Sequence, residues 1–154
     1  MEKTTIHRNI IRGGALLIGV FFFTLPLIEC SQDTSLNATG LEIATSSGDL
    51  FGETDEGGNI LAFFLLAIPI VLLVMTFASK SFGVLAIVSA VGVVFKVIFM
   101  IVAQSRVAET DGLFRLTGLN WLVLTIYVGL CVFTFYCKKQ ETSVSAYKPE
   151  GSTT

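Results

Sequence analysis

Charged residues are scarce in this sequence. They make up 14% of its 154 residues, whereas hydrophobic residues make up 53%. A soluble domain usually carries about 25% charged residues, and so few charges cannot cover a surface that faces water. The sequence also lacks a basic patch interleaved with aromatic residues, which argues against a nucleic-acid partner.

Residues that carry catalysis or bind metals are also few. The single histidine is His7, and the three cysteines, Cys30, Cys131 and Cys137, form no CxxC pair. A nucleophile needs an activating base beside it, and a zinc site needs clustered His or Cys ligands. The sequence therefore predicts no enzyme activity, no metal site and no cofactor.

The apolar residues gather in blocks that are long enough to cross a membrane. About 20 helical residues span the hydrocarbon core at 1.5 Å per residue. We therefore expect an all-α membrane protein in which four transmembrane helices form one bundle. The predicted spans are residues 10–28, 60–79, 82–103 and 119–137, which make residues 1–137 a single membrane domain, followed by a disordered tail at 138–154.

The lysines and arginines near the ends of these spans predict an orientation, because cytoplasmic loops carry an excess of both. One side of the membrane would receive Lys3, Arg8, Arg12, Lys80, Lys138, Lys139 and Lys148, and the other side only Arg106 and Arg115. We therefore expect both termini in the cytoplasm and outward loops at residues 31–58 and 104–118. The protein would lie as a multi-pass protein in a cytoplasmic or plasma membrane.

Two prolines fall within the predicted spans. Pro26 would lie in the last turn of the first span. The loss of a backbone hydrogen bond costs little there because the helix is already ending. Pro69 lies near the middle of the second span and frees a backbone carbonyl. Spanning helices tolerate such a proline when a neighbouring helix satisfies that carbonyl.

One lysine lies inside a span. Lys96 is about 21 Å along the third span from Phe82, and a charge at mid-membrane costs about 2.5–3.5 kcal/mol without a partner or water. In one interpretation Lys96 extends outward and pairs with Glu29, at the outer end of the first span. In the other, Lys96 lines an ion or proton path, or contacts a partner subunit.

The third span also carries several small residues. Stripes of such residues let helices approach closely. We expect this span to pack tightly inside the bundle rather than to dimerise. The small residues are Gly83, Ala86, Ser89, Ala90 and Gly92.

The loop at 31–58 is the only sizeable polar loop, and it is acidic. Its acids lack the spacing of a calcium-binding loop, so we interpret them as a solvated surface. Apolar and polar residues alternate at 41–45, which predicts a short strand or an ordered turn. Asn37 begins an N-x-T sequon, which matters only in a secretory-pathway host. The residues expected to offer an outward contact surface are Thr39, Gly40, Leu41, Ile43 and Ala44.

Two short segments, LPLIECS at 25–31 and TGLEIAT at 39–45, resemble a pattern in uncharacterised small bacterial four-span membrane proteins. In those proteins the first span ends in a turn that contains Pro and Cys. A short outward loop and three more spans follow. The resemblance implies a four-span fold and brings no activity with it.

These observations predict a non-enzymatic integral membrane protein, a small subunit or partner of a larger membrane assembly. Its expected partners are the lipid bilayer and other membrane protein subunits. The alternative is a small transporter or channel component with Lys96 on its pathway, in which Pro69 lets the second span flex.

Overall fold

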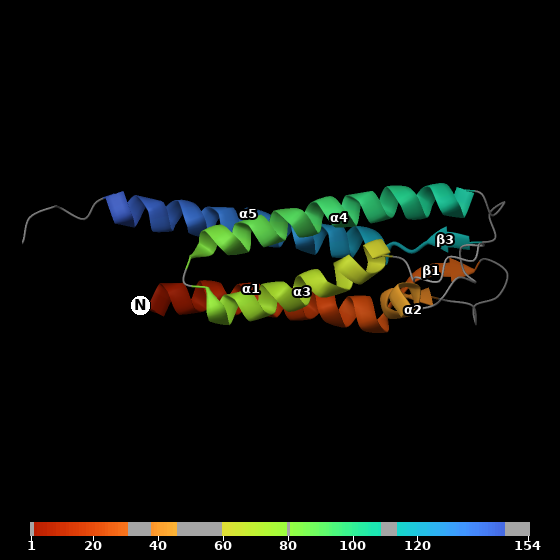
Figure 1. Cartoon of the computed structure of the whole chain (residues 1–154), viewed down its shortest axis with the longest axis horizontal. Coiled ribbons are helices and arrows are strands. Elements are labelled where there is room, and N and C mark those ends of the chain that lie inside the picture. Colours follow the sequence, from red (N-terminus) through yellow and green to blue (C-terminus); the bar gives the residue numbers. More distant parts are fainter. Residues whose placement is uncertain (1, 31–37, 46–59, 80, 109–113, 147–154) are drawn as a thin grey trace, which may run out of the picture.

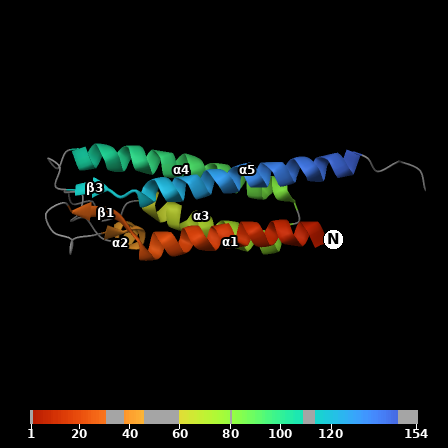
Figure 2. The same cartoon turned by 180° about the vertical axis from the view of Figure 1, so that it is seen from behind.

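The computed structural model describes residues 2–30, 38–45, 60–79, 81–108 and 114–146. Four long helices run side by side in it (Figures 1 and 2), and all four are long and apolar enough to cross a membrane. They are α1 (Glu2–Thr24), α3 (Ile60–Ala78), α4 (Phe82–Ala108) and α5 (Leu119–Ala146). The prediction of a helical chain with four potential spans is confirmed.

Each helix buries one stripe of side chains at alternating steps of three and four residues. On α4 the stripe is Phe82, Leu85, Ser89, Gly92, Lys96, Phe99 and Ala103, and on α5 it is Asn120, Val123, Tyr127, Leu130, Thr134 and Cys137. This period is typical of helices that pack as left-handed bundles. Of the small residues on α4, the structure buries Ala86, Ser89 and Gly92, whereas Gly83 and Ala90 are half-buried.

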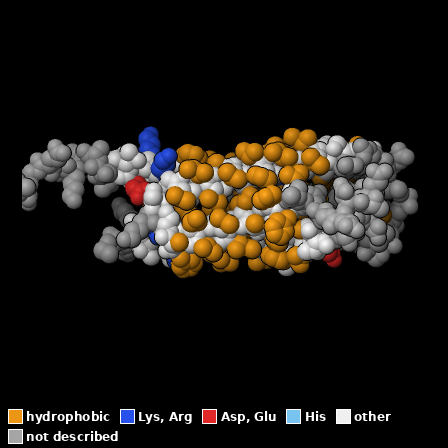
Figure 3. Space-filling view, in the orientation of Figure 1, with side chains coloured by type: hydrophobic (Ala, Val, Ile, Leu, Met, Phe, Trp, Pro, Cys, Tyr) orange, Lys and Arg blue, Asp and Glu red, His pale blue; other side chains and the backbone are white. Residues whose placement is uncertain are grey.

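The opposite faces of the helices carry exposed apolar side chains, which together we call the apolar wall. Figure 3 shows these side chains gathered on one face of the bundle. It includes the exposed side chains of Leu16, Val20, Phe63, Val74, Phe77, Ile87, Val94, Ile101, Val132 and Phe135. A soluble monomer rarely exposes so much contiguous apolar surface, so this wall suits contact with lipid.

The first helix ends earlier than residue 28, the predicted end of the first span. α1 ends at Thr24, and Pro26 begins strand β1 (Pro26–Cys30). A proline disfavours the helical conformation of the residue before it and has no N–H to donate. Pro26 therefore ends the helix, and the predicted boundary is wrong.

β1 is the central strand of a small antiparallel sheet that the sequence did not predict. Its neighbours are β2 (Ala38–Thr39) and β3 (Phe114–Leu116). The sheet lies at one end of the helices, which we call the sheet end, and α1 begins at the opposite end (Figure 1). α4 continues beyond the predicted boundary at residue 103 to Ala108. Near this end of the helix, Phe99 and Ala103 pack against the sheet.

Residues 41–45 form a helix rather than the expected strand or turn. α2 (Gly40–Thr45) begins with a reciprocal cap. The backbone N–H and the hydroxyl of Thr39 donate to Glu42 Oε2 at 2.8 and 3.0 Å, and the Glu42 N–H donates to Thr39 Oγ1 at 3.3 Å. Thr-x-x-Glu is a capping box, a helix-start signal that the alternation of apolar residues concealed.

α2 packs against the bundle at the sheet end with most of the residues that were expected to contact a partner. Gly40, Ile43 and Ala44 are buried, and a Cβ on Gly40 would lie 2.5 Å from the ring of Phe22. These three residues therefore belong to the protein's own core, and the prediction that they form an outward contact surface is wrong. Thr39 and Leu41 are half-buried.

The cap of α2 predicts a pH dependence. Hydrogen bonds from the backbone and the hydroxyl of Thr39 lower the pKa of Glu42. Because the folded pKa lies below the unfolded one, the cap stabilises α2 above the unfolded pKa, and this contribution disappears as the pH falls through the folded pKa. We expect Glu42→Gln to speed amide hydrogen exchange in α2 at pH 7, relative to wild type, after correction for intrinsic rates.

The same comparison below the folded pKa of Glu42 should show no difference, because the wild-type side chain is then protonated too. Thr45→Ala, at the other end of α2, serves as a control whose effect should not depend on pH. An effect of Glu42→Gln that is equal at both pH values would contradict the proposed role of the carboxylate.

The last helix extends past residue 137, where the sequence predicted a disordered tail. α5 is helical to Ala146, and Glu141 in this extension accepts a hydrogen bond from the N–H of Phe82 at 3.1 Å. A carboxylate at this position satisfies one of the free N–H groups at the start of α4. The prediction of disorder is therefore wrong up to residue 146. The predictions for residues 147–154, for Asn37 and for the acids beyond residue 45 lie outside the described residues.

Candidate functional site

Lys96 is fully buried, with 0% of its surface exposed. Its Nζ donates a hydrogen bond to Asn120 Oδ1 at 2.7 Å and lies 5.0 Å from the centre of the Phe99 ring. An amide oxygen and an aromatic face can both stabilise a cation. The lysine is thus held inside the protein by neutral groups.

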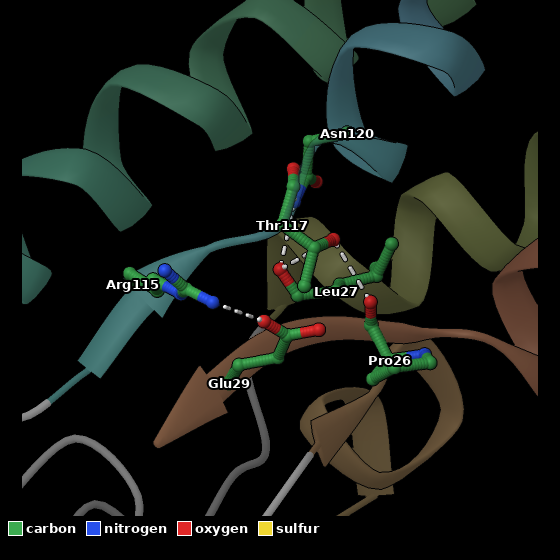
Figure 4. Close-up of polar contacts among 6 residues, drawn as sticks. All are labelled: Pro26, Leu27, Glu29, Arg115, Thr117 and Asn120. Atoms are coloured by element: carbon green, nitrogen blue, oxygen red, sulfur yellow. Dashed lines mark hydrogen bonds and ion pairs between the residues drawn. The ribbon is translucent and has the colours of Figure 1, made fainter. Parts of the chain in front are cut away.

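Asn120 connects this lysine to the sheet. Its Nδ2 donates to the carbonyl of Leu27 at 2.7 Å, and the hydroxyl of Thr117 donates to the carbonyl of Pro26 at 2.9 Å (Figure 4). We call Lys96, Asn120, Thr117 and the two carbonyls the sheet-end network. It joins α4, α5 and β1, and the hydrogen bonds of Asn120 to Lys96 and to Leu27 are buried.

Glu29 has a different partner from the one that the sequence suggested. Its carboxylate forms an ion pair with Arg115 at 3.4 Å, between facing residues of β1 and β3 (Figure 4). The Glu29 side chain is 34% exposed, whereas Lys96 is fully buried and bonds to Asn120. The prediction that Lys96 reaches outward to Glu29 is therefore wrong.

The ion pair itself contributes little to stability. The Arg115 side chain is 73% exposed. Exposed pairs contribute about 0–1 kcal/mol because water and salt screen them. The buried bonds of the sheet-end network are therefore the stronger link between the sheet and the helices.

Lys96 lies close to one boundary of the apolar wall. Its partner Asn120 is in the first turn of α5, next to Trp121, whose side chain is 66% exposed. Tryptophan is enriched where the membrane meets water. The lysine therefore lies at the level of an interfacial residue, far from the middle of α5.

Polar side chains recur along α5 at seven-residue intervals. Apolar residues of the buried stripe, Val123, Leu130 and Cys137, alternate with them. Neighbouring polar positions are about 10.5 Å apart at 1.5 Å per residue. We call this set the heptad column: Asn120, Tyr127, Thr134 and Glu141.

Members of the heptad column bind neighbouring helices. The hydroxyl of Thr134 lies 3.2 Å from that of Ser89 on α4, and Glu141 caps the first residue of the same helix. Together with the bond between Lys96 and Asn120, these contacts link α4 and α5 at separate levels. Because apolar layers separate the levels, these contacts fix the register of the two helices.

Tyr127 compensates for the proline in α3. Pro69 has no N–H, so the carbonyl of Leu65, four residues earlier, lacks its helical donor. The hydroxyl of Tyr127 donates to that oxygen at 3.3 Å. A neighbouring helix therefore satisfies the freed carbonyl, which is the condition under which a spanning helix tolerates such a proline.

This compensation predicts the outcome of a double-mutant cycle. Tyr127→Phe should lower the free energy of unfolding by about 1–3 kcal/mol, because the buried carbonyl of Leu65 loses the hydroxyl. In a Pro69→Ala background, residue 69 supplies its own N–H, so the same change should cost much less. Unfolding in mixed detergent micelles measures both values. An equal cost in the two backgrounds would show that the hydroxyl has no such role.

Two arginines of α1 bind the last turn of α3 at the end of the bundle opposite the sheet. Arg12 Nε donates to Thr76 Oγ1 at 3.0 Å, and Arg8 donates to the carbonyl of Thr76 at 3.1 Å. The last carbonyls of a helix lack intrahelical donors and carry partial negative charge. The arginines therefore hold α1 to α3, a contact that the sequence analysis missed.

The described residues offer no cluster of His, Cys, Asp and Glu that could hold a metal ion. Within them Cys30, Cys131 and Cys137 are free thiols. No family model matches the chain, and no curated protein or solved structure matches it either. The class that the fold defines is a helical chain with four helices suited to cross a membrane.

Proposed function

We propose that this chain is a non-enzymatic, multi-pass membrane protein that works as a small subunit or partner in a larger membrane assembly. One observation supports this most: the polar side chains buried among the described residues form hydrogen bonds within the protein itself. They are Thr76, Ser89, Lys96, Thr117, Asn120 and Thr134. These buried polar groups hold the protein's own helices and sheet together. A function that relies on contacts at the outer surface is consistent with this arrangement.

We infer in addition that both termini lie in the cytoplasm. Arg8, Arg12, Lys138 and Lys139 are near the end of the bundle where α1 begins, which supports this orientation under the positive-inside rule. The sheet end would then face outward. A membrane-impermeant thiol reagent should label Glu42→Cys in intact cells and Thr142→Cys only after lysis, above the background of the native cysteines.

The surfaces available to a partner are the apolar wall and the exposed residues of the sheet end. At the sheet end these residues include Glu42 and Thr45 on α2 and Arg115 on β3. On the wall, Val132 is 65% exposed. These exposed positions, rather than the buried residues of α2, are therefore the ones at which contact with a partner should be tested.

A photo-crosslinking amino acid at residue 42, 45 or 132, introduced in the native host, tests the proposal. We expect at least one position to give a single protein adduct of defined mass, and native mass spectrometry in mild detergent to show the same partner in fixed stoichiometry. Phe22, which is buried and already carries an aromatic side chain, is the matched control position and should give no adduct to another protein. A lone monodisperse species without adducts would contradict the proposal.

A second candidate function is a small transporter or channel component with Lys96 on its pathway. The supporting observation is that the buried Nζ of Lys96 bonds to a neutral amide oxygen. The apolar layers of the heptad column oppose this function. Lys96→Met and Lys96→Gln in a flux assay distinguish the two: unchanged flux at normal expression would exclude the pathway.

A further inference from the structure

Basic side chains form a collar at the end of the bundle where α1 begins and α5 ends. Arg8 and Arg12 on α1 are half-buried, and Lys138 and Lys139 on α5 are exposed. In Figure 3 the Lys and Arg side chains lie just beyond one edge of the apolar wall. We call Arg8, Arg12, Lys138 and Lys139 the basic collar.

Two members of the collar lie against exposed aromatic rings of the apolar wall. The guanidinium carbon of Arg12 is 3.8 Å from the ring centre of Phe77, which is 67% exposed. Lys138 Nζ is 5.9 Å from the ring centre of Phe135, which is 47% exposed. Each pair puts a cation at the boundary of the wall and an apolar ring on the wall itself.

The two lysines of the collar, Lys138 and Lys139, present exposed positive charge at this edge of the wall. Among the described side chains at this end, Glu141 is the acidic one, and its carboxylate accepts the N–H of Phe82. Cations at the edge of a membrane-spanning surface attract anionic lipid headgroups, about fivefold in binding per Lys or Arg.

A bilayer can contact the collar and the wall at the same time. We propose that the basic collar binds the phosphate-bearing headgroups of anionic phospholipids, whose acyl chains lie along the apolar wall beside Phe77 and Phe135. This inference goes beyond the proposed function because it requires no protein partner. Arg8 and Arg12 also bind Thr76, so the exposed lysines of α5 are the better positions for a test.

The full chain, purified with equal amounts of phosphatidylglycerol and phosphatidylcholine in mixed micelles, provides the test. Native mass spectrometry counts the lipids that each protein molecule retains. We expect wild type to retain phosphatidylglycerol in preference to phosphatidylcholine. Lys138→Gln with Lys139→Gln should reduce that preference by about fivefold for each lysine that contacts a headgroup. Both side chains are exposed, so the variant should fold.

Arg115→Gln is the matched control, since it removes one exposed positive charge at the sheet end. It should leave the lipid preference unchanged. The proposal is overturned if wild type shows no preference, if the preference survives the double replacement, or if Arg115→Gln reduces it as much. None of these results depends on whether a protein partner exists.

Discussion

Asn120→Leu should lower the free energy of unfolding by about 3 kcal/mol, because the buried ammonium of Lys96 and the buried carbonyl of Leu27 each lose a hydrogen-bond partner. Asn120 Oδ1 accepts a hydrogen bond from Lys96 Nζ at 2.7 Å, and both side chains are fully buried. Leucine has a similar size but no acceptor. Among the described residues, the ammonium would then keep its contact with the Phe99 ring but no acceptor from Asn120. Unfolding of the purified protein in mixed detergent micelles measures the loss.

A second replacement should reverse much of that loss. Lys96→Met in the Asn120→Leu background removes the charge as well, and apolar residues of similar volume often replace a buried charged group at little cost. Recovery should stay about 1 kcal/mol short, because Asn120 also donates to the carbonyl of Leu27. Lys139→Met, an exposed control, should change stability by less than about 0.5 kcal/mol. A double variant that is no more stable than Asn120→Leu would contradict this explanation.

The helices could be predicted from the sequence because the signal for a span is local. Apolar length alone indicated starts at residues 60, 82 and 119, where α3, α4 and α5 begin. The sheet could not be predicted in this way. Glu29 and Arg115 face each other across β1 and β3 although they are 86 residues apart, and strands of three to five residues carry almost no pattern of their own.

The partner of Lys96 could not be predicted by looking for an opposite charge, because Asn120 is neutral. A carboxylate is the usual counterpart of an intramembrane lysine, yet an amide oxygen accepts the same hydrogen bond. A signal was present: Asn120, Tyr127, Thr134 and Glu141 recur at heptad spacing, and the first three lie in a mostly apolar segment. Polar residues at this period indicate a helix that pairs with its neighbours through buried hydrogen bonds.

The position of the wide Tyr127 ring explains why α4 needs a glycine at its centre. A Cβ on Gly92 would lie 2.6 Å from Tyr127 Cε1 and 3.0 Å from Ile68 Cγ2. Gly92→Leu should therefore force the ring away and break its hydroxyl's bond to the carbonyl of Leu65. We expect a loss of about 4 kcal/mol in the free energy of unfolding, from overpacking and from the unsatisfied carbonyl together.

Gly129→Leu is the matched control, because a Cβ at Gly129 on the exposed face of α5 would meet nothing within 4 Å. Leucine favours a helix over glycine by about 0.8 kcal/mol, so this variant should be neutral or slightly more stable. In the Tyr127→Phe background, Gly92→Leu should cost about 1–3 kcal/mol less than in wild type, since the hydrogen bond is already absent. If the cost is the same in both backgrounds, the glycine serves only to make room for the ring and does not support the bond that compensates for Pro69.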